Sequence, residues 1–179
     1  MALRKEKPKI IILNSSSFAR HFTEHAEQLS AIGLVSRLDV PKDVPDEVLA
    51  EKLQGANAII ASVTPRISGD VMEKLPELVL IARHGIGCDN VDLEAATAKG
   101  IFVSKVEGII EQEAVAEHAV ALMLAVGRNL QCGYVSVRES QWAERAKYLG
   151  IELRNKRVGL LGLGNIGTRV AEILSLGFR

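Results

Sequence analysis

Short apolar runs alternate with helix-like segments along the first hundred residues. The apolar runs lie at residues 9–13, 34–40, 57–61, 78–83 and 101–104. Strands that alternate with helices pair in parallel through right-handed crossovers, because a tight turn cannot join two parallel neighbours. The pattern therefore predicts an α/β fold, with a flavodoxin-like domain over residues 1–104 that contains a five-stranded parallel sheet.

The composition agrees with this fold class and argues against several partners. Hydrophobic residues make up 47% of the chain and aromatic residues only 4%, which is typical of helix-covered parallel sheets. The 22 basic and 22 acidic side chains cancel, so we expect no nucleic acid and no anionic membrane as a partner. The apolar run at residues 119–126 is too short to span a bilayer. Cys88 and Cys132 suggest no disulfide framework and no metal site, and we expect a cytoplasmic protein with reduced thiols.

Residues 105–179 follow a different pattern. Apolar residues recur at helical spacing in a long segment at 111–130, where Val115, His118, Leu122 and Val126 form one stripe. A second helix is predicted near 133–143, a strand at 157–161 and a helix at 165–176. We interpret this part as interdomain helices and the first strand–helix unit of an incomplete Rossmann domain.

A glycine-rich run joins that last strand to its helix. Gly162, Gly164 and Gly167 have the G-x-G-x-x-G spacing that allows a tight turn, a close approach to pyrophosphate and close packing of the helix. The N–H groups of Asn165 and Ile166 would then meet the pyrophosphate at the positive end of the helix. The alternative is a glycine turn that only packs a helix on a strand. The acidic ribose partner expected about 20 residues further on would lie beyond Arg179.

Three blocks in order carry a family resemblance. They are Arg83-His84-Gly85-Ile86-Gly87-Cys88-Asp89-Asn90-Val91-Asp92, the helical block at 114–124, and the segment at 150–167. Together they resemble the D-isomer-specific 2-hydroxyacid dehydrogenases, especially the phosphoglycerate dehydrogenase type, and the resemblance extends from Lys9 to the end of the chain. At the crossing between domains Glu107 stands where that family often has a proline, which leaves the hinge geometry there open.

The resemblance implies a flavodoxin-like substrate domain, a Rossmann domain inserted into it, and hydride transfer between a 2-hydroxy acid and a nicotinamide. It implies that Gly85, Ile86 and Gly87 bind the substrate carboxylate, although these glycines alone would also suit an ordinary strand-to-helix turn. NAD is the expected cofactor, with NADP left open, and 3-phosphoglycerate is one candidate substrate. A homodimer through the nucleotide domain is implied for the complete protein.

The resemblance also places the catalytic Arg, Glu and His beyond Arg179. We therefore expect no catalytic residue in this chain and no activity from the 179 residues alone.

Several other side chains invite a catalytic interpretation that we do not adopt. His118 is expected to pack on the apolar stripe of its helix and Glu117 to have a structural or hinge role. His84 is expected near the substrate cleft. Surface solvation is the default for Arg66, whereas Arg83 is a candidate for binding a substrate phosphate.

The remaining candidates are one histidine pair and one thiol. His21 and His25 have helical spacing but no further metal ligands. Cys88 has no basic partner that would make it a nucleophile, and we expect it to be a small packing residue.

Two other functions remain open. The first is a non-catalytic sensor or corepressor that binds dinucleotide on the same fold. The second is a free-standing flavodoxin-like module in which the residues after 104 serve as an oligomerisation arm.

Overall fold

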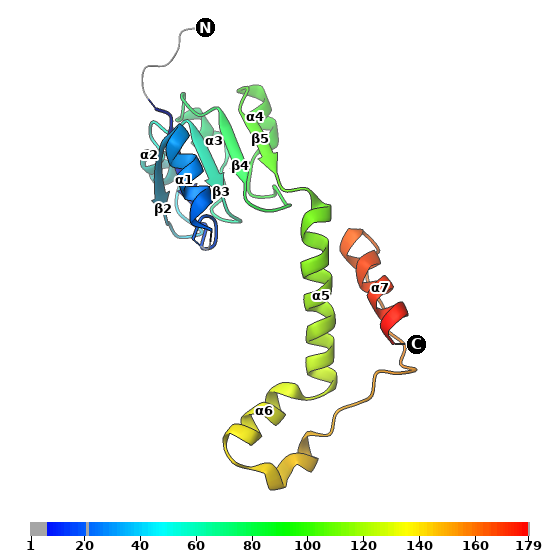
Figure 1. Ribbon diagram of the computed structural model, residues 1–179. Coiled ribbons are helices and arrows are strands. Elements are labelled where there is room, and N and C mark those ends of the chain that lie inside the picture. Colours follow the sequence, from blue (N-terminus) through cyan, green and yellow to red (C-terminus); the bar gives the residue numbers. More distant parts are fainter. Residues whose placement is uncertain (1–6, 21, 179) are drawn as a thin grey trace. The chain divides into compact units, whose positions relative to one another are not determined.

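The structure is a computed structural model that describes residues 7–20 and 22–178. The chain divides into two compact units, Met1–Val106 and Glu107–Arg179. In the first unit, coloured blue to green in Figure 1, helices pack against one sheet.

The sheet of the first unit contains five parallel strands. They are β1 (Lys9–Leu13), β2 (Leu34–Leu38), β3 (Ala58–Ala61), β4 (Leu80–Arg83) and β5 (Phe102–Lys105). Their order is β2-β1-β3-β4-β5, which is the flavodoxin order. The α/β fold class predicted from the alternating pattern is confirmed.

A helix follows each of the first four strands. These helices are α1 (Thr23–Ile32), α2 (Asp46–Lys52), α3 (Gly69–Glu73) and α4 (Leu93–Ala98). Ser68 and Asp92 are N-caps whose side chains accept hydrogen bonds from Val71 N and Ala95 N, at 3.3 and 2.9 Å. Each cap fixes the point at which the chain leaves the carboxyl edge of the sheet and turns back along its face.

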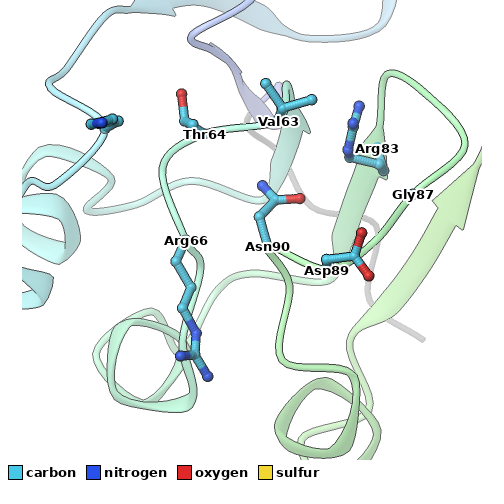
Figure 2. A pocket seen from close by; sticks show the side chains of 8 residues that line it. Val63, Thr64, Arg66, Arg83, Gly87, Asp89 and Asn90 are labelled. Carbon is cyan, nitrogen blue, oxygen red and sulfur yellow. The ribbon is translucent and has the colours of Figure 1, made fainter.

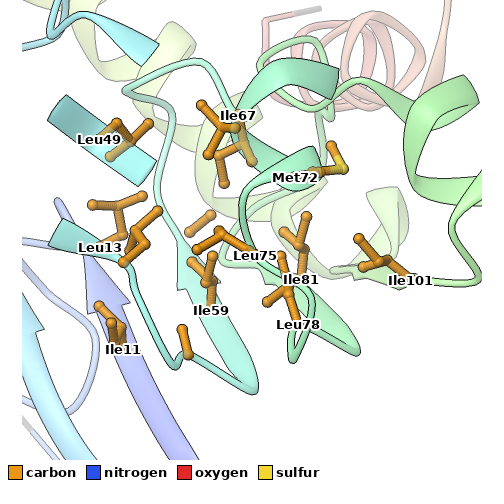
Figure 3. Packing of buried hydrophobic residues seen from close by; sticks show 14 of the residues in the cluster. Ile11, Leu13, Leu49, Ile59, Ile67, Met72, Leu75, Leu78, Ile81 and Ile101 are labelled. Carbon is orange, nitrogen blue, oxygen red and sulfur yellow. The ribbon is translucent and has the colours of Figure 1, made fainter. Parts of the chain in front are cut away.

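The side chains of each strand alternate between the two faces of the sheet. Ile11 and Leu13 of β1 join Ile59 of β3 and Ile81 of β4 in a cluster that includes buried residues of α2, α3 and α4 (Figure 3). Ile10, Ile12 and Ile60 point to the other face, where Phe18 and Leu29 pack on them. Burial on both faces explains why these strands are continuous apolar runs.

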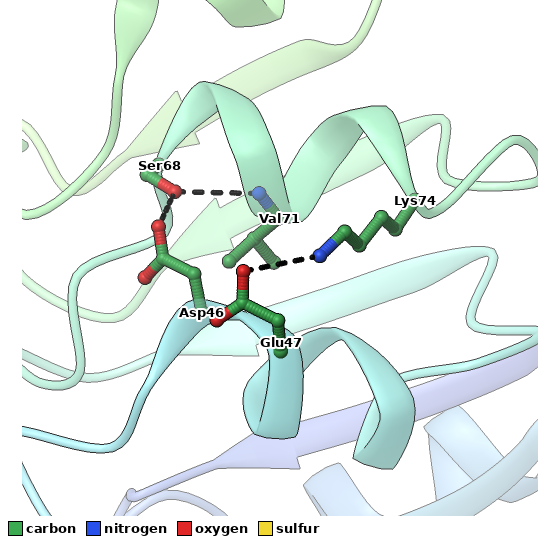
Figure 4. A network of polar contacts seen from close by, with 5 residues as sticks. All are labelled: Asp46, Glu47, Ser68, Val71 and Lys74. Carbon is green, nitrogen blue, oxygen red and sulfur yellow. Dashed lines mark hydrogen bonds and ion pairs between the residues drawn. The ribbon is translucent and has the colours of Figure 1, made fainter.

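Two polar contacts join α2 to α3 at the surface (Figure 4). Ser68 Oγ donates to the carboxylate of Asp46, and Lys74 Nζ lies 3.4 Å from Glu47 Oε1. The pKa of Glu47 is lowered, first by a hydrogen bond from its own backbone and then by the charge of Lys74. The Lys74–Glu47 ion pair is exposed and contributes little to stability, whereas the half-buried hydrogen bond between Ser68 and Asp46 orients the start of α3 against α2.

The second unit contains α5 (Gly108–Gly127), α6 (Leu130–Arg138), the 3-10 helix η1 (Trp142–Tyr148) and α7 (Asn165–Gly177). The helix predicted at 111–130 begins earlier, because Glu107 is an extended N-cap at φ −67° and ψ 137°. The predicted strand at 157–161 is wrong, since these residues form no strand in the structure. A strand requires a neighbour to satisfy its backbone groups, and no second strand of this unit occurs among the described residues.

The face of α5 that packs on α7 differs from the predicted stripe. Ala116 and Val120 are buried with Val170 of α7, whereas Val126 is 77% exposed. His118 is also exposed, so the packing role expected for it is wrong. The helix is apolar on nearly all sides, and its sequence period therefore could not identify which side would contact a partner.

An ion pair strengthens the contact between α5 and α7. Arg169 Nε lies 2.7 Å from Glu113 Oε1, and Arg169 Nη1 lies 2.9 Å from Glu172 Oε2. The pKa of Arg169 is raised by its hydrogen bonds to Glu113 and Glu172. This guanidinium thus joins the two helices at a half-exposed site.

Substitution of Ile59 tests whether β3 lies at the centre of the sheet. Its side chain is 0% exposed, and we expect Ile59→Ala to lower the free energy of unfolding by about 2–5 kcal/mol, as for other buried aliphatic residues. Leu34→Ala on the edge strand β2 is the control, because Leu34 is 62% exposed and its loss should cost less than about 1 kcal/mol. Urea unfolding followed by circular dichroism measures both, and equal losses would contradict the assigned core.

Candidate functional site

β2 and β3 lie on opposite sides of β1, so the connections that follow β1 and β2 leave the carboxyl edge of the sheet in opposite directions. Open α/β sheets bind ligands at such a point. Asn14 forms three hydrogen bonds at this edge. Its amide Nδ2 donates to Val40 O at 2.9 Å and to Thr64 Oγ1 at 3.3 Å. Its Oδ1 accepts from Val40 N at 2.8 Å. One side chain therefore links the loops that follow β1, β2 and β3.

The loop after β4 contains the predicted carboxylate-binding residues Gly85, Ile86 and Gly87. His84 N donates to Ala61 O at 2.8 Å, and Gly85 O accepts from Val106 N at 3.1 Å, so the start of the loop is fixed on both sides. Gly85 has φ +145°, and a Cβ there would lie 2.5 Å from Nη1 of Arg83. Glycine is therefore favoured at position 85 by the backbone conformation, and a side chain there would also displace the end of the Arg83 side chain.

A pocket of about 390 Å³ opens beside this loop (Figure 2). We call it the β3–β4 pocket, and its lining residues are Lys42, Val63, Thr64, Arg66, Arg83, Gly87, Asp89 and Asn90. Its volume suits a small organic ligand. Asn90 holds the two main loops together, because its Nδ2 donates to the carbonyl groups of Ser62 and Pro65, both at 3.0 Å.

Arg83 and His84 follow one another but contact different parts of the unit. Arg83 is the next residue after Ile81 on the face covered by α2, α3 and α4; it is 8% exposed and lines the pocket. Its Nη1 donates to His84 O, while its Nε has no hydrogen-bond partner. A buried guanidinium with an unused donor is therefore present at the pocket wall.

His84 lies on the α1 side. Its Nδ1 is 3.3 Å from the hydroxyl of the buried Ser15, and the ring of Phe18 packs edge-on at a centroid distance of 5.2 Å. Ser15 Oγ also accepts from Phe18 N at 3.1 Å. The imidazole is thus engaged by a hydroxyl and an aromatic ring, and His84 is not among the residues that line the pocket.

The glycine-rich turn of the second unit leads directly into α7. Gly162 has φ +95°, and Gly164 is the extended N-cap of the helix. A Cβ on Gly167 would lie 2.1 Å from Gly162 O, so only glycine permits this close approach of helix and turn. The N–H groups of Asn165 and Ile166 belong to the first turn, where no intrahelical acceptor exists. The residues present therefore fit an anionic group such as pyrophosphate.

The other singled-out residues form no further site. Glu117 and Arg66 are exposed, and Cys88 is half-buried. His21 lies outside the described residues, so the structure does not test its pairing with His25. Within residues 7–20 and 22–178, no three His, Cys, Asp or Glu side chains are placed to hold a metal ion. No helix in the described part of the chain is both long and apolar enough to cross a membrane.

The sheet order and the parallel strands joined by helices define an α/β protein of flavodoxin-like topology. Residues 10–171 match the catalytic domain of the D-isomer specific 2-hydroxyacid dehydrogenases, and the chain belongs to this family.

Individual relatives agree with this assignment. The chain is 35% identical over 148 residues to a D-3-phosphoglycerate dehydrogenase of Methanocaldococcus jannaschii, covering 83% of this chain and 28% of the relative. It is 38% identical over 158 residues to a glyoxylate reductase of Aeropyrum pernix, covering 85% and 47%. The chain thus spans less than half the length of either relative.

A solved structure shows the same fold. It is an NADPH-dependent glyoxylate/hydroxypyruvate reductase of Sinorhizobium meliloti in complex with NADP and malonate, which matches with a TM-score of 0.73 and 27% identity. The match covers 96% of this chain and 51% of that one.

Some pocket residues were not singled out from the sequence. Lys42 follows β2 and Thr64 follows β3, and neither belongs to a recognisable motif. Asn90 is part of the block that carries the family resemblance, yet its role in joining two loops depends on the fold. The sequence contains only a weak signal for these residues, namely that polar residues which follow parallel strands gather at one edge of the sheet.

Gly85→Ala tests the requirement for glycine at the loop. A side chain at the positive φ of this residue would be strained, and the new methyl group would displace the end of the Arg83 side chain, so we expect the free energy of unfolding to fall by about 1–3 kcal/mol. Gly87→Ala is the matched control: its Cβ would lie 3.2 Å from the mobile Asp89 carboxylate, and it should cost less than about 1 kcal/mol. Thermal and urea unfolding of both variants provide the comparison, and a harmless Gly85→Ala would rule out the described loop conformation.

Gly167→Ala tests the close packing of α7 against the glycine turn. The contact to Gly162 O is with rigid backbone, and relieving it should lower the local stability of α7 by about 1–3 kcal/mol. Gly164→Ala should change it by less than about 0.5 kcal/mol, since nothing lies within 4 Å of its Cβ position. Hydrogen exchange of the α7 amides measures both effects, and identical exchange in the two variants would refute the packing argument.

Proposed function

We propose that the chain forms part of a nicotinamide-dependent oxidoreductase that acts on the CH–OH group of a D-2-hydroxy acid. The observation that carries this proposal is the coexistence, in a member of this family, of two glycine-containing elements of the kind that bind anions in other proteins. One is the Gly85–Gly87 loop beside the β3–β4 pocket, and the other is the glycine turn that opens α7.

The substrate loop would bind the carboxylate through the backbone N–H groups of Ile86 and Gly87. Successive backbone N–H groups in a glycine-rich loop form a concave binding site for anions. The small 2-hydroxy or 2-keto acid would then occupy the β3–β4 pocket, of which Gly87 is a lining residue. Among such acids, 3-phosphoglycerate is the candidate substrate.

The dinucleotide would bind at the second unit. Gly162, Gly164 and Gly167 shape the turn, and the N–H groups of Asn165 and Ile166 would bind the pyrophosphate at the helix N-terminus. The bound nicotinamide would supply the hydride chemistry. We propose NAD as the cofactor, while the NADP in the Sinorhizobium meliloti reductase keeps NADP open for this chain.

The 179-residue chain is proposed to be inactive by itself. The family resemblance requires a histidine held by a glutamate and an arginine near the substrate. In the described part of the chain His84 instead contacts the hydroxyl of Ser15, and His118 is exposed with no carboxylate partner in hydrogen-bond range. No residue described here is therefore proposed as a catalytic acid or base.

The complete protein is proposed to be a cytoplasmic homodimer. Val115, Leu122 and Val126 expose apolar surface on one side of α5, which a second copy would cover. Two cysteines, Cys88 and Cys132, are too few and too far apart in the sequence for a disulfide framework, which supports a reducing compartment.

A dinucleotide-binding sensor or corepressor on the same fold is the second candidate. The glycine turn before α7 suits this function as well as it suits the enzyme, so a dinucleotide titration does not distinguish the two.

Amide chemical shifts of the ¹⁵N-labelled chain test the proposal directly. We expect D-glycerate to shift the amides of Ile86 and Gly87, and NADH to shift those of Asn165 and Ile166, with Gly100 unaffected in both titrations. We expect no oxidation of NADH with glyoxylate, pyruvate or hydroxypyruvate. Turnover above background would disprove the inactivity, and unchanged Ile86 and Gly87 amides would disprove the substrate site.

A further inference from the structure

The side chain of His84 joins two strands that do not pair with each other. β3 lies between β1 and β4 in the sheet, so the ends of β1 and β4 are about 10 Å apart, twice the spacing of neighbouring strands. His84 is the first residue after β4, yet its Nδ1 lies 3.3 Å from the hydroxyl of Ser15 in the loop after β1. We call this contact the His84–Ser15 bridge. It connects the start of the Gly85–Gly87 loop to the opposite side of β3.

The Ser15 end of the bridge is held by its neighbours in the fold. Ser15 is 2% exposed, and its Oγ accepts a hydrogen bond from Phe18 N at 3.1 Å. Nη1 of Arg37 on β2 donates to Ser15 O at 3.2 Å, and Nη2 of the same side chain donates to Phe18 O. A serine hydroxyl has one proton and two lone pairs, so it accepts from Phe18 and still bonds to the imidazole of His84 in either tautomer. The hydroxyl is therefore a fixed partner for His84.

The His84 end is held by its backbone as well as by its ring. His84 N donates to Ala61 O at 2.8 Å, and His84 O accepts from Nη1 of Arg83. The imidazole lies edge-on to the ring of Phe18 at a centroid distance of 5.2 Å, and Phe18 stacks on His25 of α1 at 6.2 Å. These contacts restrict both the backbone and the rotamer of His84, and with them the start of the loop that follows.

The loop after His84 has few other contacts that hold its binding groups. Val106 N donates to Gly85 O at 3.1 Å, but within the described part of the chain the N–H groups of Ile86 and Gly87 donate no hydrogen bond to another residue. Glycine has more backbone freedom than any other residue, so the peptide planes on both sides of Ile86 can rotate. Two N–H groups bind one carboxylate well only if both already point to it, because ordering a flexible loop on binding lowers the affinity. A fixed residue before Gly85 reduces that freedom.

We infer that His84 is a positioning residue for the substrate carboxylate: the His84–Ser15 bridge orients the Gly85–Gly87 loop so that the N–H groups of Ile86 and Gly87 face the same anion. His84 is not among the residues that line the β3–β4 pocket, so it acts through the loop and not by touching the substrate. This inference rests on the proposed function, because the carboxylate is assigned there to Ile86 and Gly87.

Two variants of His84 separate its hydrogen bond from its packing, with D-glycerate titrated into the ¹⁵N-labelled 179-residue chain. His84→Phe keeps a ring beside Phe18 and removes the bridge, and we expect it to weaken D-glycerate about threefold to tenfold, the effect of one neutral hydrogen bond. His84→Asn keeps a polar atom bonded to Cγ, as Nδ1 is, and should bind within about twofold of the unchanged chain. His118→Phe, the same change at an exposed histidine of α5, is the matched control and should leave the affinity unchanged.

A double-mutant cycle assigns the effect to the bridge itself. Ser15→Ala removes the other partner and should weaken D-glycerate by a similar factor, whereas Ser16→Ala, at an exposed neighbour in the same loop, should not. Because both variants break one contact, the double variant Ser15→Ala/His84→Phe should bind about as weakly as either single variant. Losses that multiply in the double variant would show that the two residues act independently, and this would overturn the inference.

Failure of the inference and failure of the proposed function give different results. Thermal unfolding of each variant identifies a temperature at which all are folded, and the titrations are made there. If D-glycerate shifts the Ile86 and Gly87 amides of the unchanged chain and His84→Phe lowers the melting temperature but not the affinity, the bridge only stabilises the fold; the proposed function then stands and the inference is wrong. If D-glycerate leaves these amides unshifted in the unchanged chain, the proposed function fails and the inference fails with it.

Discussion

The parallel pairing of five strands is the constraint from which the rest of the first unit follows. Parallel strands connected by helices have little surface to leave open to water, and Ile11 and Ile12 of β1 are buried on opposite faces of the sheet. Polar and charged side chains are consequently displaced to the ends of the strands. At the carboxyl end the loops after β2, β3 and β4 converge on one pocket, which therefore collects side chains from distant parts of the sequence.

The two-residue period of β4 divides the end of this strand into two environments. Ile81 and Arg83 point to the face with the larger apolar cluster, and the charge of Arg83 is buried because it continues an apolar row. His84 points to the α1 side, where Ser15 and Phe18 contact it. Adjacent ionisable residues thus have separate roles: one lines the pocket, and the other fixes the start of the Gly85–Gly87 loop to the loop after β1.

The spacing of apolar residues, and the helix-like segments that separate the apolar runs, predicted the five strands and the helices after them. Each short apolar run is distinct in the local sequence. They did not predict the face of α5 that packs on α7, since an almost uniformly apolar helix has no preferred side. The prediction of a strand at 157–161 was wrong because a strand depends on a neighbouring strand, which the local sequence does not specify. The burial of Arg83 and the position of Lys42 at the pocket depend on the tertiary fold, and no motif marks Lys42.

The glycines of the two motifs differ in the reason for which glycine is present, and this limits what each motif indicates about ligand binding. Gly167 is required by packing, because a side chain would collide with Gly162 O, and Gly85 is required by its positive φ. Gly164 has nothing within 4 Å of its Cβ position, so no contact within the chain explains it. Open space at a glycine does not by itself indicate a ligand, because Gly100, Gly133 and Gly177 also have nothing within 4 Å of the Cβ position. The proposed dinucleotide site at α7 therefore depends on the spacing of the whole motif and on the helix that follows it, and not on Gly164 alone.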